Sequence, residues 1–196
     1  MKFVLATANP GKIREMREIL GATGFNILTR DECGIDFEVE ETGSTFFENA
    51  LIKAKAICEA TGMSAIADDS GLLVDALNGE PGVYSSSYGG ENLSSDERCA
   101  YLLKKLQGKE QARAKFVCTV ICYFPDGEYI AAEGECLGHI VSQPSGSGGF
   151  GYDPIFLVEG KNKTMAELTS DEKNEISHRN EALSKLTLLL KERGYM

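Results

Sequence analysis

The N-terminal segment shows a pattern of hydrophobic and polar positions that recurs along this chain: a short apolar run, a polar turn and an amphipathic helix. Lys2–Ala6 is mostly apolar and predicts a buried strand. Asn9 is a favoured N-cap residue, and Pro10 suits the first helical position because an N–H there would have no intrahelical partner. Apolar residues then recur at helical spacing, at Ile13, Met16, Ile19 and Leu20.

Two capping boxes predict the starts of further helices. Thr45 with Glu48, and Ser94 with Glu97, each combine a hydroxyl with an acid one helical turn later. We expect the first of these helices to end at Gly62 and to place Phe47, Leu51, Ala54 and Cys58 on one apolar face. We expect the second to bury Cys99, Leu102, Leu103 and Leu106.

Apolar and β-branched runs predict the remaining strands. Phe25–Leu28 is a short one, Ser64–Ala67 leads into a double aspartate, and Leu72–Leu77 continues the apolar pattern after it. Phe116–Phe124 is nearly continuous in apolar residues and predicts a strand buried on both faces. A Pro-Asp-Gly turn follows, so Tyr129–Val141 is expected to return as the second strand of an antiparallel hairpin.

The order of elements predicts an α/β protein with a mixed sheet rather than a purely parallel one. Residues 78–90 and 143–151 are rich in glycine and serine and are expected to be loops. A last helix is expected to bury Ala182, Leu183, Leu186, Leu189 and Leu190. The 196 residues contain no repeat and no linker, and we expect a single domain over residues 1–196.

Composition excludes some functions. The formal net charge of −10 argues against nucleic-acid binding, which needs a basic face, but not against a nucleotide held by a metal and a few local cations. The apolar stretch at the N-terminus is too short for a signal peptide or a membrane span, so we expect a cytoplasmic protein. The six cysteines form no Cys-x-x-Cys motif and are expected to be reduced thiols.

Two segments carry groups that suit metal-assisted phosphoryl chemistry. Thr7, Asn9 and Lys12 lie at a predicted helix start, where N–H groups and a lysine attract anions; the alternative is a simple cap beside a solvated lysine. Asp68 and Asp69 follow an apolar strand, and they can share Mg²⁺ only if that strand ends or bends near Gly71. The alternative for these acids is a solvated turn.

Other candidates are weaker. Glu41 precedes the second predicted helix, where an acid is often only a partner of the helix dipole. Lys53 lies within that helix, off the face that carries Leu51 and Ala54, so it can point into a cleft; a surface lysine is the default alternative. Residues 146–151 match G-x-G-x-x-G, but no strand precedes them and no helix follows, so we reject a dinucleotide site. We expect this loop to present Phe150, Tyr152 and Asp153. His178 and Arg179 open the last helix, and no nucleophile elbow supports a Ser/His/Asp triad there.

Five segments together resemble the Ham1-like inosine triphosphate pyrophosphatase family, also called non-canonical purine NTP or XTP/dITP pyrophosphatases. They are TANPGK, EETGSTFFENALIKA, ADDSGLLVDALNGEPGVYSSSY, GFGYDPIF and SHRNEAL, in the family's order over nearly the whole chain. The serines of VYSSSY depart from the alanine and arginine common in relatives. The resemblance implies an elongated mixed sheet with flanking helices, two lobes around a central nucleotide-binding cleft, and a homodimer.

The resemblance also implies an activity and its residues. Deaminated purine triphosphates (ITP, dITP, XTP) would be hydrolysed to the monophosphate and pyrophosphate with Mg²⁺. Asp69 would accept the proton of the attacking water, and Glu41, Asp68 and Asp69 would hold the metal. The phosphates would face Thr7, Ala8, Asn9, Lys12, Lys53 and Ser70. The nucleoside would contact Phe150, Gly151, Tyr152, Asp153, Lys173, His178 and Arg179.

Base choice follows from hydrogen bonding in this assignment. Hypoxanthine and xanthine carry an acceptor at C6, which donors from Arg179 or His178 can meet, whereas adenine presents a donor there. Two alternatives stay open: a Maf-like pyrophosphatase acting on modified pyrimidine nucleotides, and a nucleotide-binding module without catalysis. The acids at Glu41, Asp68 and Asp69 argue against the second, because a pure binder does not need all three.

Overall fold

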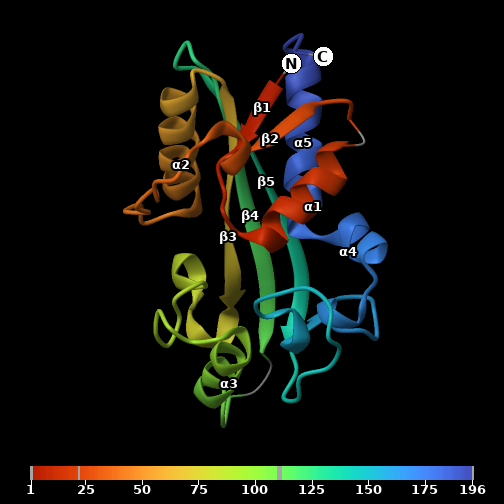
Figure 1. Ribbon diagram of the computed structural model, residues 1–196. Helices are drawn as coiled ribbons and strands as arrows, with labels where there is room; N and C mark the ends of the chain where they lie inside the picture. Colours follow the sequence, from red (N-terminus) through yellow and green to blue (C-terminus); the bar gives the residue numbers. More distant parts are fainter. Residues whose placement is uncertain (1, 22, 110–111, 196) are drawn as a thin grey trace. The chain divides into compact units, whose positions relative to one another are not determined.

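The computed structural model describes residues 2–21, 23–109 and 112–195, and its strands form one six-stranded sheet in the order β2-β1-β3-β4-β5-β6 (Figure 1). The strands are β1 (Lys2–Leu5), β2 (Asn26–Thr29), β3 (Ser64–Val74), β4 (Arg113–Tyr123), β5 (Tyr129–Ile140) and β6 (Phe156–Val158). β1 pairs in parallel with β2 and β3, whereas β5 pairs antiparallel with β6. The prediction of a mixed α/β fold is confirmed.

The described residues form five α-helices, of which the first three begin where the capping signals predict. They are α1 (Pro10–Gly21), α2 (Phe46–Thr61), α3 (Ser95–Lys105), α4 (Ser170–Ile176) and α5 (His178–Glu192). Thr45 and Ser94 cap α2 and α3 through complete capping boxes. The sequence analysis missed α4, although Thr169 and Glu172 form a further capping box at its start. Among the described residues, no helix has the length and apolarity that a membrane crossing needs.

The chain divides into two compact units, each assembled from separate segments. The first comprises residues 1–69, 118–134 and 178–196, and the second comprises residues 70–117 and 135–177. β3, β4 and β5 each contribute residues to both units. The single domain expected over residues 1–196 stays a prediction.

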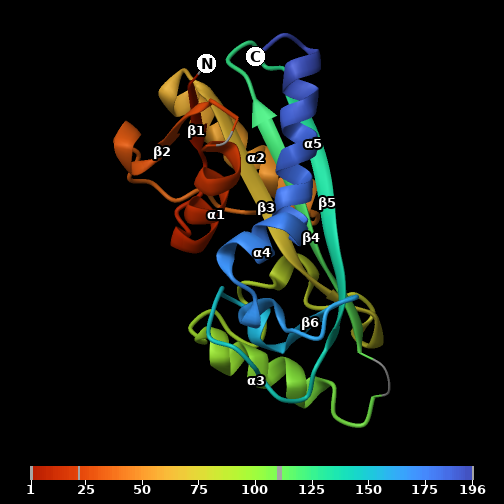
Figure 2. The ribbon, with the colours of Figure 1, turned by 90° about the vertical axis from the view of Figure 1, so that its right-hand side faces the viewer.

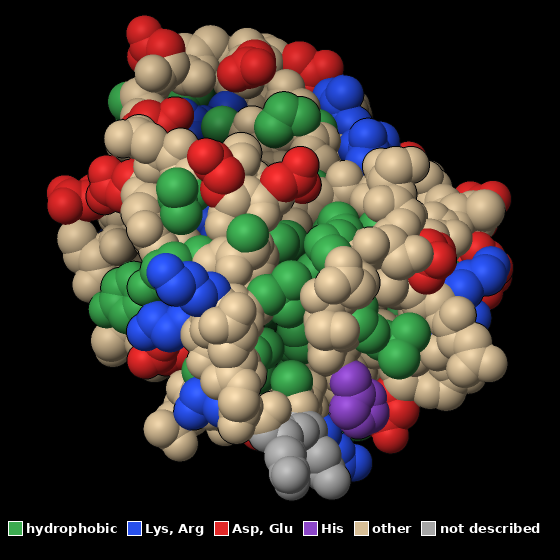
Figure 3. Space-filling model, turned by 90° about the horizontal axis from the view of Figure 1, so that it is seen from below, with side chains coloured by type: hydrophobic (Ala, Val, Ile, Leu, Met, Phe, Trp, Pro, Cys, Tyr) green, Lys and Arg blue, Asp and Glu red, His purple; other side chains and the backbone are tan. Residues whose placement is uncertain are grey.

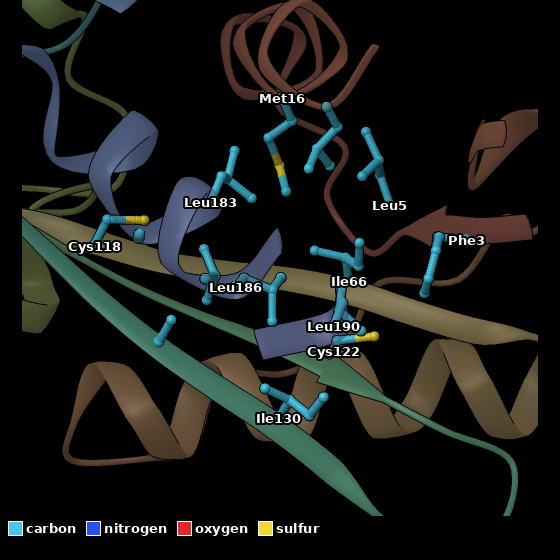
Figure 4. Packing of buried hydrophobic residues seen from close by; sticks show 14 of the residues in the cluster. Phe3, Leu5, Met16, Ile66, Cys118, Cys122, Ile130, Leu183, Leu186 and Leu190 are labelled. Atoms are coloured by element: carbon cyan, nitrogen blue, oxygen red, sulfur yellow. The ribbon is translucent and has the colours of Figure 1, made fainter. Parts of the chain in front are cut away.

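The first unit packs helices on both faces of its strands. α1 and α5 lie on one face and α2 lies on the opposite face (Figures 1 and 2). Figure 4 shows Met16 of α1 and Leu183 and Leu186 of α5 pointing toward Ile66 of β3. On the α2 side, small residues such as Ala54 and Ala67 allow the helix to lie close to the strands. The unit therefore has two apolar layers, separated by the sheet.

The second unit has its own core, built from α3, β6 and its parts of β3, β4 and β5. Leu72, Leu102, Ile155, Phe156 and Met165 are fully buried in it. The view from below shows hydrophobic side chains near the middle of that face and many charged side chains toward its rim (Figure 3). The six cysteines form no disulfide in the described residues, and Cys33 is the one that is partly exposed.

Candidate active site

The double aspartate lies inside a continuous strand, and this corrects the expectation that the strand ends there. β3 runs without interruption from Ser64 to Val74. Because side chains of a strand alternate between its faces, Asp68 and Asp69 point in opposite directions. Asp68 contacts residues of α1 and α5, and Asp69 contacts residues of α2. The two acids therefore have different hydrogen-bond and ion-pair partners, although Lys12 and Lys53 act electrostatically on both.

Asp68 is the anionic centre of a buried ion-pair network. Its Oδ2 lies 3.1 Å from Lys12 Nζ, 3.0 Å from Arg179 Nη2 and 3.2 Å from Arg179 Nε. Arg179 also pairs with Glu15 of α1. Burial by itself would raise the pKa of Asp68, but Lys12, Arg179 and Lys53 outweigh it and hold that pKa well below its usual range. Asp68 is thus ionised and firmly held.

Asp69 is held on the other face by two residues of α2. Asn49 Nδ2 donates to Asp69 Oδ2 at 3.3 Å, and Lys53 Nζ donates to Asp69 Oδ1 at 3.2 Å. Lys53 Nζ also lies 2.8 Å from Glu41 Oε2. One ammonium therefore joins Glu41 to Asp69, two carboxylates that are far apart in the sequence.

The pKa of Asp69 is raised, in contrast to that of its neighbour. Burial is the largest cause, and the negative charges of Glu41 and Asp68 add to it, while Lys53 and Lys12 oppose it. The pKa of Lys53 is raised as well, because the three acids outweigh the effect of burial. A carboxylate with a raised pKa is the better proton acceptor of the pair.

The buried face of α2 matches the predicted one only in part, because Ala54 and Cys58 are buried as predicted but Phe47 is not. Phe47 is 37% exposed, whereas Asn49 and Lys53 are 4% and 7% exposed. The default interpretation of Lys53 as a surface lysine is therefore wrong. Periodicity predicts the face that carries large apolar side chains, but α2 packs mainly through small residues together with Ile57. Its polar side chains are buried by the acids that they contact.

The turn before α1 is a complete cap. Asn9 Oδ1 accepts from the N–H groups of Gly11 and Lys12 at 2.9 and 3.1 Å, and the Asn9 carbonyl accepts from Ile13 N at 2.9 Å. Thr7 Oγ1 accepts from Asn9 N at 3.2 Å. These N–H groups are already used within the turn, so the attraction for an anion here comes mainly from Lys12. Ala8 and Asn9 are exposed.

The acids of the first unit fit a divalent cation in part. Glu41 and Asp69 already share one cationic partner in Lys53, and carboxylate oxygens are the ligands that Mg²⁺ prefers. Within the described residues, no three His, Cys, Asp or Glu side chains form a ready-made metal site. Mg²⁺ usually needs only one or two carboxylates, because water and substrate phosphates complete its shell. Glu41 and Asp69 therefore suit this role better than Asp68, which is occupied with Lys12 and Arg179.

The second unit contains a separate buried charge pair. Lys173 Nζ lies 2.7 Å from Asp153 Oδ2 and 4.7 Å from the ring centroid of Phe150. Asp153 Oδ2 also accepts from Phe150 N at 2.8 Å. Gly149 has a φ of +71°, and a Cβ there would overlap Asp153. The loop is thus closely fitted around the Asp153 carboxylate.

Two of the three loop residues expected at the surface are buried. Tyr152 and Asp153 are both 4% exposed, and Tyr152 Oη donates to the Ser85 carbonyl at 3.0 Å. Phe150 is half-buried. Tyr152 therefore serves packing, since its hydroxyl finds a partner inside the unit, and the prediction that the loop presents it is wrong. The Gly151 carbonyl accepts from Cys99 Sγ at 3.4 Å.

The remaining candidates are Ser70 in β3 and two residues at the start of α5. Ser70 follows Asp69 in β3 and is partly exposed. His178 and Arg179 form the first turn of α5, as predicted, and are 6% and 1% exposed. Burial of Arg179 against Asp68 and Glu15 supports an ion-pairing role, and its reading of the base stays a prediction.

Two residues escaped the sequence analysis. Glu15 of α1 pairs with Arg179, and Asn49 of α2 bonds with Asp69. Both lie within amphipathic helices, where a polar residue normally faces solvent, so periodicity gives no signal for them. Each of them is a polar residue on the buried face of its helix. That position would have identified them, but it can be recognised only when the buried face is known.

Comparisons with known proteins agree with the resemblance. The Ham1 family model matches residues 3–188. The dITP/XTP pyrophosphatase of Bacillus subtilis is 50% identical over 189 residues, which cover 95% of this chain and 96% of that protein. A dITP/XTP pyrophosphatase of Thermus thermophilus is 49% identical over 189 residues, covering 95% of this chain and 90% of that protein.

Solved structures agree as well. The HAM1 protein of Coxiella burnetii superimposes with a TM-score of 0.89 at 41% identity, covering 98% of this chain and 99% of that one. The Ham1 protein of Staphylococcus aureus gives a TM-score of 0.88 at 44% identity, covering 98% and 100%. By sequence over nearly its full length and by fold, the chain belongs to the Ham1 family.

Proposed function

We propose that this protein is a nucleoside triphosphate pyrophosphohydrolase that converts deaminated purine nucleotides (dITP, XTP and ITP) to the monophosphate and pyrophosphate. The observation that carries the proposal is the buried Asp69 carboxylate, linked through Lys53 to Glu41 and adjacent in β3 to the Lys12 partner Asp68. The similarity to proteins named dITP/XTP pyrophosphatases supports the substrate class. Removal of such nucleotides would cleanse the nucleotide pool.

The charged residues of the candidate site in the first unit each have a role in this reaction. Asp69, with its raised pKa, accepts the proton of the water that attacks the α-phosphorus. Lys12 and Lys53 offset the charge that builds on the departing pyrophosphate. Asp68 stays ionised and holds Lys12 beside Asp69. When bound by Glu41 and Asp69, Mg²⁺ would supply electrostatic stabilisation of the phosphate oxygens.

The residues expected at the nucleoside are those of the loop at 150–153 with Lys173, and His178 with Arg179. The half-buried ring of Phe150 offers a face on which a purine base can stack, and Lys173 lies over that ring. The Asp153 carboxylate holds both groups in place. Mg²⁺ as the metal, a homodimer and a cytoplasmic location belong to the same proposal.

Incubation of the purified protein with dITP, XTP, ITP, dTTP or ATP and Mg²⁺ tests the proposal. Pyrophosphate and monophosphate should appear in equal amounts from the deaminated purines, with far slower release from ATP. A preference for dTTP would support the Maf-like alternative instead. Binding without any turnover would leave a nucleotide-binding module. Release of inorganic phosphate rather than pyrophosphate would contradict cleavage at the α-phosphorus.

A further inference from the structure

We propose that Asn49 is a positioning residue, whose side-chain amide ties the Asp69 carboxylate to the segment that carries Glu41. The inference rests on the proposed function of Asp69 and goes beyond it, because Asn49 is not among the residues assigned to binding or chemistry there. Asn49 is 4% exposed and lies in the first turns of α2. Its amide has one partner on each side.

The two ends of the amide bond to different elements. Asn49 Oδ1 accepts from Gly43 N at 2.8 Å, and Asn49 Nδ2 donates to Asp69 Oδ2 at 3.3 Å. A backbone N–H can only donate, so the Gly43 bond fixes which end of the amide faces Asp69. The NH₂ group must then point at the carboxylate. This orientation is set before any ligand arrives.

Asn49 and Lys53 clamp the same carboxylate from one helix face. They are four residues apart in α2, so their side chains are neighbours. Asn49 takes Oδ2 and Lys53 takes Oδ1. Each also reaches the segment before the helix, Asn49 at Gly43 and Lys53 at Glu41. Two parallel links therefore join Asp69 to this segment.

The link through Asn49 is the one that persists in the proposed reaction. Lys53 is expected to turn toward the phosphates, and a cation bound to Glu41 and Asp69 would replace its ammonium. The neutral amide has no such competing task. It holds the carboxylate through Oδ2, so the carboxylate keeps its direction when Oδ1 exchanges its lysine partner. Small displacements of a reacting group lower rates strongly, so a fixed carboxylate is what the chemistry needs.

Gly43 fits this arrangement closely. A Cβ at this position would lie 2.6 Å from Asn49 Oδ1 and 2.6 Å from Glu48 Cβ. No side chain can therefore stand between the turn and the amide. Gly43→Ala is expected to push the amide away from Asp69, and so to reproduce the effect of changing Asn49 itself.

Two substitutions at Asn49 separate the two bonds. Asn49→Asp keeps an acceptor for Gly43 N but loses the donor to Asp69, whereas Asn49→Leu loses both. We expect kcat for dITP to fall about 10- to 100-fold in both variants, as for other groups that orient a reacting ligand. KM should change little in Asn49→Leu, because the phosphate and base contacts remain and no charge is added. Amide hydrogen exchange at Gly43 should accelerate in Asn49→Leu but stay near the wild-type rate in Asn49→Asp.

Thr45→Ala provides the matched control. It removes the cap of the same helix, at the Thr45 Oγ1 bond to Glu48 N, without touching Asp69. This variant should melt at a lower temperature and keep the wild-type kcat. If Thr45→Ala lowered kcat as much as Asn49→Leu, the effect of Asn49 would be general loosening of α2, and the proposal would be overturned. A wild-type kcat in Asn49→Leu would overturn it directly.

A double-mutant cycle measures the coupling between two substitutions in their effect on kcat, and general destabilisation does not produce such a coupling. Gly43→Ala and Asn49→Leu break the same bridge, so the double variant should lose little more activity than either single variant. Multiplied losses would contradict a shared bridge. Exchange at Gly43 is measured without nucleotide, so it tests the bridge even if the wild-type protein released no pyrophosphate, in which case the proposed function alone would fail.

Discussion

At the scale of single residues, Asp68 and Asp69 are neighbours with opposite electrostatics. Asp68 lies among Lys12 and Arg179, and its pKa is lowered despite its burial. The pKa of Asp69 is raised by burial and by the acids around it. A lowered pKa means that the folded state stabilises the carboxylate, and a raised pKa means that it disfavours the carboxylate. The same side chain therefore contributes stability at one position and costs stability at the next.

Substituting asparagine for each aspartate separates its effect on stability from its effect on turnover. Asp68→Asn leaves Arg179 and Glu15 with the wrong charge balance in a buried network, and we expect a loss of about 3–5 kcal/mol in the free energy of unfolding. Asp69→Asn removes a carboxylate that burial disfavours but also a partner of Lys53, so its loss of stability at neutral pH should be smaller than that of Asp68→Asn. Its turnover should collapse while nucleotide binding survives. Thermal unfolding together with kcat for dITP checks both variants, and near-normal turnover in Asp69→Asn would remove Asp69 from its role.

The pH dependence of Asp68→Asn has a definite sign. The folded pKa of Asp68 lies below its ordinary value of 3.8. Its contribution is therefore fully present above that value and is lost as the pH falls through the folded pKa. The stability gap between wild type and Asp68→Asn, followed by urea unfolding at several pH values, should be constant near neutrality and shrink below about pH 4. A gap that widened in acid would contradict the assigned ion pairs.

At the scale of elements, α5 depends on one glycine in β5. A Cβ at Gly134 would lie 2.5 Å from Ala182 N and 2.8 Å from Glu181 Cβ. Only a residue without a side chain lets the first turn of the helix approach the strand this closely. That turn carries Arg179, so the packing of a strand decides where the partner of Asp68 lies.

Gly134→Ala should displace this turn. We expect a loss of about 1–3 kcal/mol, typical of overpacking, and a lower kcat because Arg179 moves with the helix. Gly21→Ala is the matched control, since Gly21 ends α1 with nothing within 4 Å of the added Cβ. That control should be neutral or slightly stabilising by up to about 1 kcal/mol. Equal melting temperatures for the two variants would argue against the tight contact.

At the scale of the whole molecule, chain connectivity predicts cooperative unfolding. β3, β4 and β5 each belong to both compact units, so neither unit is a continuous piece of chain. We expect one calorimetric transition, with the calorimetric and van't Hoff enthalpies in agreement. Added dITP, or a non-hydrolysable analogue with Mg²⁺, should raise the midpoint of that single transition. Two separable transitions would contradict the single domain expected from the sequence.

Local sequence patterns were enough to predict much of the secondary structure of this chain. Capping residues such as Asn9, Thr45 and Ser94 act within one helical turn, so the sequence alone determined where α1, α2 and α3 begin. Apolar runs determined the central strands, because a buried strand needs a continuous apolar surface. The motifs also determined the family, since five of them recur in order.

Only the tertiary structure decided how the polar residues are partnered. Asp68 and Asp69 are adjacent in sequence, yet β3 continues through them and sends them to different faces. Asn49, Glu15 and Lys53 became part of the buried site because their partners come from distant segments. Hydrophobic periodicity reports which side of an element avoids water, whereas charge pairing depends on which elements meet, and no local pattern contains that information.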